Sequence, residues 1–175
     1  MDDQVVVMGV SAAGKSSVGI ALAGLLGARF VDADDLHPAA NVARMAAGVP
    51  LSDGDRGPWL DAVGAELAAA ADHDPAGGGL VVACSALKRA YRDRIRHSAP
   101  GTFFVHLDGD PELLAARAAA RTGHFMPPSL LASQLEILEP LAADEAGIRL
   151  DVADSVPELA RQAAAALAEA STAEG

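Results

Sequence analysis

Short apolar runs alternate with helix-length stretches along the chain, and this alternation limits the possible folds more than any other feature. The runs are rich in β-branched residues and have the length of strands; they are Gln4–Gly9, Arg29–Asp32, Gly79–Cys84, Thr102–Leu107 and Gly147–Val152. Between them, apolar residues recur every three or four positions, as in helices, at Ser16–Leu26, Ala86–His97, Pro111–Ala120 and Val156–Ala170. The alternation predicts a three-layer α/β fold, with a five-stranded parallel sheet covered by helices on both faces.

The segment 38–73 interrupts this alternation. It carries two helical patterns, Ala39–Ala47 and Trp59–Ala71, separated by the turn-rich stretch Gly48–Pro58. We expect this insertion, at about residues 36–73, to cover the edge of the sheet. The 175 residues suit one core, so we predict a single domain over residues 1–175.

Composition excludes several classes of function. A formal net charge of -11 at pH 7 disfavours nucleic-acid binding, which depends on Lys and Arg neutralising phosphates. Cys84 has no second cysteine to pair with, and the N-terminus lacks the basic and apolar regions of a signal peptide. No apolar run reaches the ~20 residues that span a bilayer. We therefore expect a cytoplasmic protein with neither a membrane nor a nucleic-acid partner.

The most specific motif is Gly9-Val-Ser-Ala-Ala-Gly14-Lys15-Ser16, which matches G-x-x-x-x-G-K-[ST] between a predicted strand and a predicted helix. Such a loop wraps its backbone amides around phosphate, while the lysine reaches the outer phosphates and the serine binds Mg²⁺. The alternative is an ordinary strand-turn-helix connection. The motif predicts ATP binding, and the predicted contacts are Gly9, Ser11, Ala12, Ala13, Gly14, Lys15, Ser16 and Ser17.

The second predicted strand ends in the acidic sequence Asp32-Ala-Asp34-Asp35. The carboxyl edge of a parallel sheet is where such folds bind their ligands, and strand alternation places Asp32 and Asp34 on one side. We predict that Asp32 joins Ser16 at the metal and that Asp34 orients or deprotonates the acceptor hydroxyl. The alternative is a group of helix N-caps, most applicable to Asp35.

Positive charge is scarce in this chain but gathers after the third predicted strand. In a helix over Ala86–His97, Lys88, Arg92 and Arg96 fall on one face at i, i+4 and i+8, which suits an anionic ligand. A solvated charged face is the alternative, and we prefer it for Arg89, Arg94 and Arg96. Tyr91 and Cys84 are interpreted as packing residues, and Trp59 as a core residue.

Several of these segments together resemble the gluconate kinases. The matching segments are Leu36-His37-Pro38, Asn41, Met45, Gly48-Val-Pro50-Leu51, Asp53, Asp55-Arg56, Pro58-Trp59-Leu60, Cys84-Ser-Ala-Leu-Lys88, Tyr91-Arg92-Asp93 and Gly123-His124-Phe125-Met126. The resemblance runs from about Val5 to Glu145. Two departures are Ala12-Ala13, where the family commonly has Gly and Ser, and Arg44, where Lys is frequent.

The resemblance implies a fold like that of nucleoside monophosphate kinases, ATP and Mg²⁺ as cofactors, and D-gluconate as a small-molecule substrate. It implies substrate contacts at Asp34, His37, Arg56, Lys88, Arg92 and His124. His37 has an equally weighted alternative as a capping or packing residue. Similar gluconate kinases are dimers, which makes a homodimer an expectation here.

After the fourth predicted strand, a helix carrying Arg117 and Arg121 leads into a breaker-rich loop, and we predict a mobile lid at about residues 121–130. In related kinases the lid arginines contact ATP, which implies that role for Arg117 and Arg121, the latter catalytic together with Lys15 and Asp34. An ion pair with Glu112 or Glu136 is the alternative for Arg117.

Three functions fit these patterns. A gluconokinase is the preferred interpretation. A related kinase for another small hydroxy acid, such as shikimate, would use the same loop, aspartates and lid. A regulator that binds nucleotide without turnover is the third, because a phosphate loop indicates binding and not transfer.

Overall fold

The computed structural model describes residues 3–73, 78–121 and 127–173, and its centre is a parallel sheet. The five strands are β1 (Gln4–Met8), β2 (Arg29–Asp32), β3 (Leu80–Ala83), β4 (Phe103–Asp108) and β5 (Gly147–Asp151), in the order β2-β3-β1-β4-β5. Every neighbouring pair is parallel. Each strand begins and ends within one residue of its predicted run, so the predicted sheet is confirmed.

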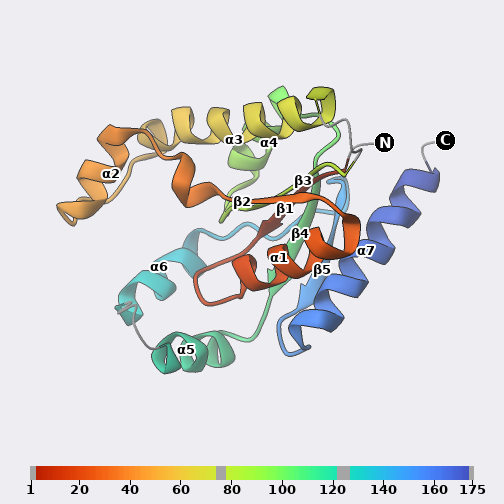
Figure 1. Cartoon of the computed structure of the whole chain (residues 1–175). Coiled ribbons are helices and arrows are strands. Elements are labelled where there is room, and N and C mark those ends of the chain that lie inside the picture. The colour runs from red at the N-terminus through yellow and green to blue at the C-terminus, as the bar shows by residue number, and fades with distance from the viewer. Residues whose placement is uncertain (1–2, 74–77, 122–126, 174–175) are drawn as a thin grey trace.

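Helices cover both faces of this sheet (Figure 1). Helices α1 (Lys15–Leu26) and α7 (Val156–Ala173) pack on one face, and α3 (Asp53–His73) and α4 (Arg89–Ser98) pack on the other. Because successive strand residues point to opposite faces, β1 contributes to two separate cores. Its Val5 and Val7 belong to the core with α1 and α7, and its Val6 and Met8 belong to the core with α3 and α4.

The insertion differs from its prediction in where its second helix begins. Its helices are α2 (Ala39–Ala46) and α3, and α3 begins at Asp53, inside the stretch predicted to be turn-rich. Reciprocal hydrogen bonds start α3 early, since the Asp55 amide donates to Ser52 Oγ at 3.1 Å and the Ser52 amide donates to Asp55 Oδ2 at 2.9 Å. Trp59 and Leu60 of α3 enter the core on one face of the sheet, and the covering of the sheet edge by the insertion stays a prediction.

Two further helices follow β4. Helix α5 (Pro111–Ala120) matches its prediction, whereas α6 (Pro128–Ile137) was not predicted and takes up the end of the proposed lid. The proline pair 127–128 was interpreted as a breaker, but proline is well suited to the first turn of a helix, where its missing N–H has no partner to lose. No helix in the described ranges is long and apolar enough to cross a membrane.

The turn before β3 contains Gly79, which packs closely against the backbone of Asp3. Gly79 has a φ of +75°, and a Cβ on it would lie 2.2 Å from the backbone oxygen of Asp3. We expect Gly79→Ala to destabilise the protein by about 2 kcal/mol or more in denaturant unfolding, because backbone strain and a backbone clash combine.

The matched control is Gly24→Ala in α1, where a Cβ would meet nothing within 4 Å. This change should stabilise the protein by about 0.5–1 kcal/mol, because alanine loses less backbone entropy on folding than glycine. Equal stability of Gly79→Ala and the wild type would show that the turn is not constrained as described.

Candidate active site

The loop Gly9–Ser16 joins the buried strand β1 to α1 at the carboxyl edge of the sheet. Position 9 has no room for a side chain, because a Cβ there would lie 2.8 Å from the Leu107 oxygen and 3.3 Å from Ala13 Cβ. Ala12 adopts a φ of 66°, so this alanine takes the left-handed conformation that glycine adopts more readily. Thus the loop's departure from the family sequence leaves a strained residue at its tip.

Lys15 lies at the base of this loop and donates from Nζ to the Val10 carbonyl at 3.0 Å. Burial lowers the pKa of Lys15, while the nearby carboxylates of Asp34 and Asp32 oppose that shift. A partly desolvated cation close to two carboxylates can bind strongly to a polyphosphate.

Ser16 and Asp32 meet beside the loop, with Ser16 Oγ donating to Asp32 Oδ2 at 3.0 Å. The described residues hold no cluster of three or more His, Cys, Asp or Glu that could form a metal site by itself. Mg²⁺ bound with nucleotide needs only one or two protein oxygens, because phosphates and water supply the others. A converging hydroxyl and carboxylate therefore fit Mg²⁺.

Asp34 also lies near the phosphate loop, but its backbone is not part of a strand, so strand alternation does not account for its position. Strand β2 ends at Asp32, and Ala33–Leu36 forms a 3₁₀ turn capped by Asp32 Oδ1, which accepts from the Asp34 amide at 3.0 Å. Asp34 is exposed as a residue, but partial desolvation of its carboxylate, together with the like charge of Asp32, raises its pKa. A carboxylate with a raised pKa is a better proton acceptor than an ordinary aspartate.

A charged cluster lies on the acceptor side, and we call Asp53, Arg56, Lys88 and Tyr91 the Asp53 cluster. Lys88 Nζ lies 3.1 Å from Asp53 Oδ2, and Arg56 Nη1 lies 3.5 Å from Asp53 Oδ1. The Tyr91 hydroxyl donates to Asp53 Oδ1, and both cations lie over the Tyr91 ring, at 5.5 Å for Lys88 and 5.8 Å for Arg56. Two cations and a hydroxyl thus converge on one carboxylate.

Two residues of the Asp53 cluster, Asp53 and Tyr91, were not predicted as site residues from the sequence. Tyr91 was interpreted as packing, yet its hydroxyl bonds to Asp53, and that bond together with the Lys88 hydrogen bond lowers the pKa of Asp53. The signal was present in the spacing, because Tyr91 follows Lys88 by three residues at the start of a helix.

Arg92 requires a correction. Helix α4 begins at Arg89, so Lys88 precedes it and turns toward Asp53, while the Arg92 side chain is fully buried and forms a bidentate ion pair with Glu145. Arg96 pairs with the same glutamate at 2.8 Å. The three cations therefore do not form one ligand-binding face, and Arg92 does not line the acceptor site in this structure.

His37 stacks on Trp59, with ring centroids 4.3 Å apart. Trp59 is buried and donates from Nε1 to the Ala33 carbonyl at 2.6 Å, which confirms it as a core residue and fixes the 3₁₀ turn that carries Asp34. Burial lowers the pKa of His37, and its charged neighbours are Asp34 and Arg56. His37 therefore lies between the aspartate beside the phosphate loop and the Asp53 cluster.

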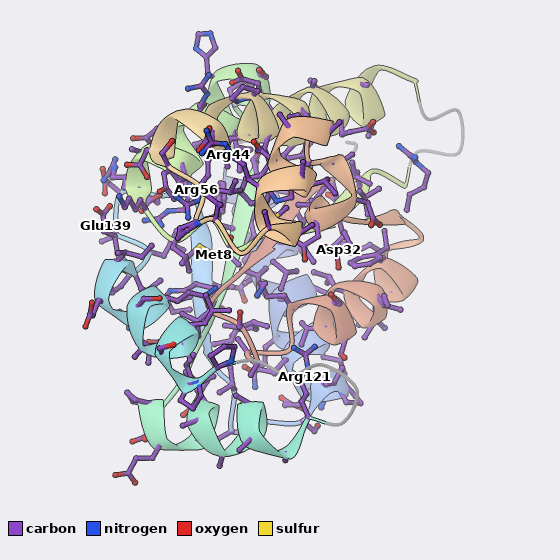
Figure 2. The ribbon with its side chains drawn as sticks, turned by 90° about the vertical axis from the view of Figure 1, so that its left-hand side faces the viewer. Met8, Asp32, Arg44, Arg56, Arg121 and Glu139 are labelled. Atoms are coloured by element: carbon purple, nitrogen blue, oxygen red, sulfur yellow. The ribbon has the colours of Figure 1, made fainter. Side chains whose placement is uncertain are left out.

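Arg117 and Arg121, which were predicted to bind ATP, differ from each other in their surroundings. Arg117 Nη2 donates to the Val152 carbonyl at 2.6 Å, and this bond takes the place of the alternative ion pair with Glu112 or Glu136. Arg121 ends α5, is exposed, and is close enough to Lys15 to affect its pKa. Figure 2 shows Arg121 on the α5 side of the molecule and Arg56 on the α3 side. His124 lies outside the described residues.

Helix α6 adds contacts that the sequence did not indicate. Gln134 Oε1 accepts from the Ser11 amide at 2.7 Å, which ties α6 to the phosphate loop, while Ser17 is exposed at the start of α1. Just beyond α6, Glu139 Oε2 accepts from the Arg89 amide at 2.6 Å (Figure 2). No motif marks either residue, because the partners in these two contacts lie 123 and 50 positions away in the chain.

Comparison with known proteins agrees with this geometry. A shikimate kinase family model matches residues 11–172. The thermosensitive gluconokinase of Escherichia coli (strain K12) is 44% identical over 158 residues, which cover 90% of this chain and 83% of that protein.

Solved structures agree as well. A gluconokinase from Sinorhizobium meliloti 1021 is 49% identical, covers 95% of this chain and 92% of its own, and has a TM-score of 0.83. A sugar kinase from Janibacter sp. HTCC2649 is 44% identical, covers 96% of this chain and 95% of its own, and has a TM-score of 0.86. With its phosphate loop, paired aspartates and parallel sheet, the chain belongs to the gluconokinase family of shikimate kinase-like P-loop kinases.

Proposed function

We propose that this protein phosphorylates D-gluconate with ATP, giving 6-phospho-D-gluconate and ADP. The observation that carries this proposal is that charged groups follow one another from the phosphate loop to the acceptor cations, each close enough to influence a neighbour's pKa. Lys15 and His37 both influence the pKa of Asp34, and Asp34 and Arg56 both influence the pKa of His37, with Arg56 belonging to the Asp53 cluster. A linear sugar acid suits this arrangement, with its hydroxyl end at Asp34 and its carboxylate end at the cations.

In this mechanism Asp34 accepts the proton of the primary hydroxyl as that oxygen forms a bond to the γ-phosphorus. The bond between the γ-phosphorus and the oxygen bridging it to the β-phosphate breaks, and ADP leaves with the electron pair. Lys15 and the loop amides offset the charge on the phosphates, with Arg121 as a further cation and Arg117 on the nucleotide. Mg²⁺, held by Ser16 and Asp32, supplies additional positive charge when bound.

The carboxylate end of gluconate is recognised by Lys88 and Arg56. Both cations already hold a carboxylate, that of Asp53, with the Tyr91 hydroxyl as a third donor. A substrate carboxylate can share or replace that interaction through the same charge-assisted hydrogen bonds. The proposed site therefore uses Lys88 and Arg56 without Arg92.

The two alternative functions are less well supported. A shikimate-type acceptor would also use an acid group, but the relatives at 44% identity or more over most of the chain include gluconokinases. A regulator without turnover would not need an aspartate with a raised pKa beside the phosphate loop. A homodimer and a cytoplasmic location stay predictions from the sequence.

The proposed substrate predicts a preference for gluconate over glucose, because glucose has no carboxylate for Lys88 and Arg56. We expect kcat/KM for gluconate to exceed that for glucose by at least about tenfold in a coupled ADP-release assay. Lys88→Met should raise the KM for gluconate by about tenfold or more while changing the KM for ATP little.

Arg161→Met is the matched control, because Arg161 is an exposed cation on α7 that pairs only locally, with Glu158. It should leave both KM values unchanged. Equal kcat/KM for gluconate and glucose in the wild type would refute carboxylate recognition, and so would a Lys88→Met enzyme with unchanged gluconate KM.

Asp34→Asn tests the proton acceptor, because asparagine keeps the shape of aspartate but loses its basicity. We expect kcat to fall about 10²-fold or more while calorimetry shows ATP binding unchanged. Since Asp34 acts deprotonated and its pKa is raised above that of an ordinary aspartate, wild-type kcat/KM should fall on acidification at a higher pH than an ordinary aspartate would give.

Asp35→Asn provides the control, because it makes the same change at the adjacent exposed aspartate. Its kcat should stay within about twofold of the wild type. If Asp34→Asn weakened ATP·Mg²⁺ binding yet kept kcat at saturating nucleotide, Asp34 would belong with the metal ligands and another group would be the base.

A further inference from the structure

Arg92 is a charged side chain with no exposed surface, and its whole guanidinium is occupied. Its Nε and Nη2 each donate to Glu145 at 2.8 Å, and the side chains are 0% and 1% exposed. Burial on its own raises the pKa of Glu145, but hydrogen bonds from Arg92 and Arg96 outweigh it and lower that pKa to about 2. The Glu145 carboxylate therefore stays ionised at neutral pH.

The same guanidinium also joins two chain segments that are distant in the sequence. Arg92 Nη1 donates to the Ala86 carbonyl at 3.1 Å and to the Leu87 carbonyl at 3.4 Å, in the turn that follows β3. It also donates to the Glu139 carbonyl at 3.1 Å, in the segment that follows α6. One side chain thus connects α4, the 86–88 turn and the 139–145 segment.

The 86–88 turn needs such support. Ala86 has a φ of 42°, a left-handed conformation that costs a residue with a Cβ roughly 1–2 kcal/mol. The Glu139 amide holds the turn from the other side by donating to the Leu87 carbonyl at 2.8 Å. The residue that leaves this turn is Lys88, whose ammonium reaches the Asp53 cluster.

Stability alone does not explain a buried ion pair. Replacing such a pair by apolar residues of similar volume is often neutral or stabilising, because removing two charges from water costs several kcal/mol per ion. A buried network with many directional hydrogen bonds does, however, fix one backbone geometry. Here the fixed geometry is that of the turn leading to Lys88 and of the helix start that carries Tyr91.

We propose that Arg92 and Glu145 are positioning residues for acceptor binding, which act by holding the 86–88 turn so that Lys88 and Tyr91 face the acid group of the substrate. The identity of that acid rests on the proposed function. Loss of Arg92 should weaken acceptor binding selectively, because Arg92 contacts neither the phosphate loop nor the aspartates beside it.

The test compares Arg92→Lys with Arg94→Lys. Both arginines lie on α4 and both form bidentate pairs, Arg94 with Asp61 at 2.7 Å for each bond, but Arg94 does not hold the 86–88 turn. A lysine at position 92 keeps the charge for Glu145 and cannot bridge to the same carbonyls. We expect Arg92→Lys to raise the gluconate KM at least about tenfold with the ATP KM within about twofold, and Arg94→Lys to change neither.

Hydrogen exchange gives a second readout that does not depend on turnover. Amides of residues 86–89 and 139–145 should exchange at least about tenfold faster in Arg92→Lys than in the wild type or in Arg94→Lys, while amides of residues 9–16 stay unchanged. If Arg92→Lys does not fold, Glu145→Gln, which keeps the shape and weakens the pair, should produce the same pattern.

Three outcomes would overturn the proposal. One is an unchanged gluconate KM in a folded Arg92→Lys enzyme, and another is an equal rise in both KM values, which would indicate general loss of structure. The third is unchanged exchange at residues 86–89. If the wild type does not phosphorylate gluconate at all, the proposed function fails, and hydrogen exchange still decides whether Arg92 holds the turn.

Discussion

The burial of β1 on both faces is the constraint on which the rest of the structure depends. Val5, Val6, Val7 and Met8 have no exposed surface, and each such side chain contributes about 1.5–3 kcal/mol when it leaves water. A strand held this firmly in the middle of the sheet fixes the point where the phosphate loop begins. It also places that point between β3, which leads into the turn that carries Lys88, and β4, whose Leu107 packs against Gly9.

The two halves of the candidate site are held by different kinds of force. The phosphate half is backbone geometry, set by a tight strand-loop-helix connection in which Gly9 packs against Leu107. The acceptor half is built from side chains of the insertion and of residues 88–91 at the start of α4, joined by the hydrogen bonds of the Asp53 cluster, and we infer that Arg92 positions it. Close packing therefore determines the geometry of the phosphate half, whereas directional polar contacts determine the geometry of the acceptor half.

This difference explains how much could be predicted from the sequence. The strands and the loop were predictable because short runs of Val, Leu and Phe and the spacing of Gly and Lys are local patterns. Arg92 was misassigned because residue spacing shows which residues share a helix face but not whether that face meets water or Glu145, fifty-three positions away. Asp34 reached its predicted neighbourhood through a 3₁₀ turn and not through strand alternation. In each case a long-range or turn-specific contact decided the geometry.

The central claim is that the substrate lies with its carboxylate at the Asp53 cluster and its far hydroxyl at Asp34, beside the phosphate loop. The position of the phosphate on the product tests this orientation most directly. Phosphorus–carbon couplings in the NMR spectrum of the product formed from gluconate and ATP should place the phosphate on carbon 6, the carbon farthest from the carboxylate. Phosphate on any other carbon, or ADP formed without a phosphorylated sugar acid, would contradict the account.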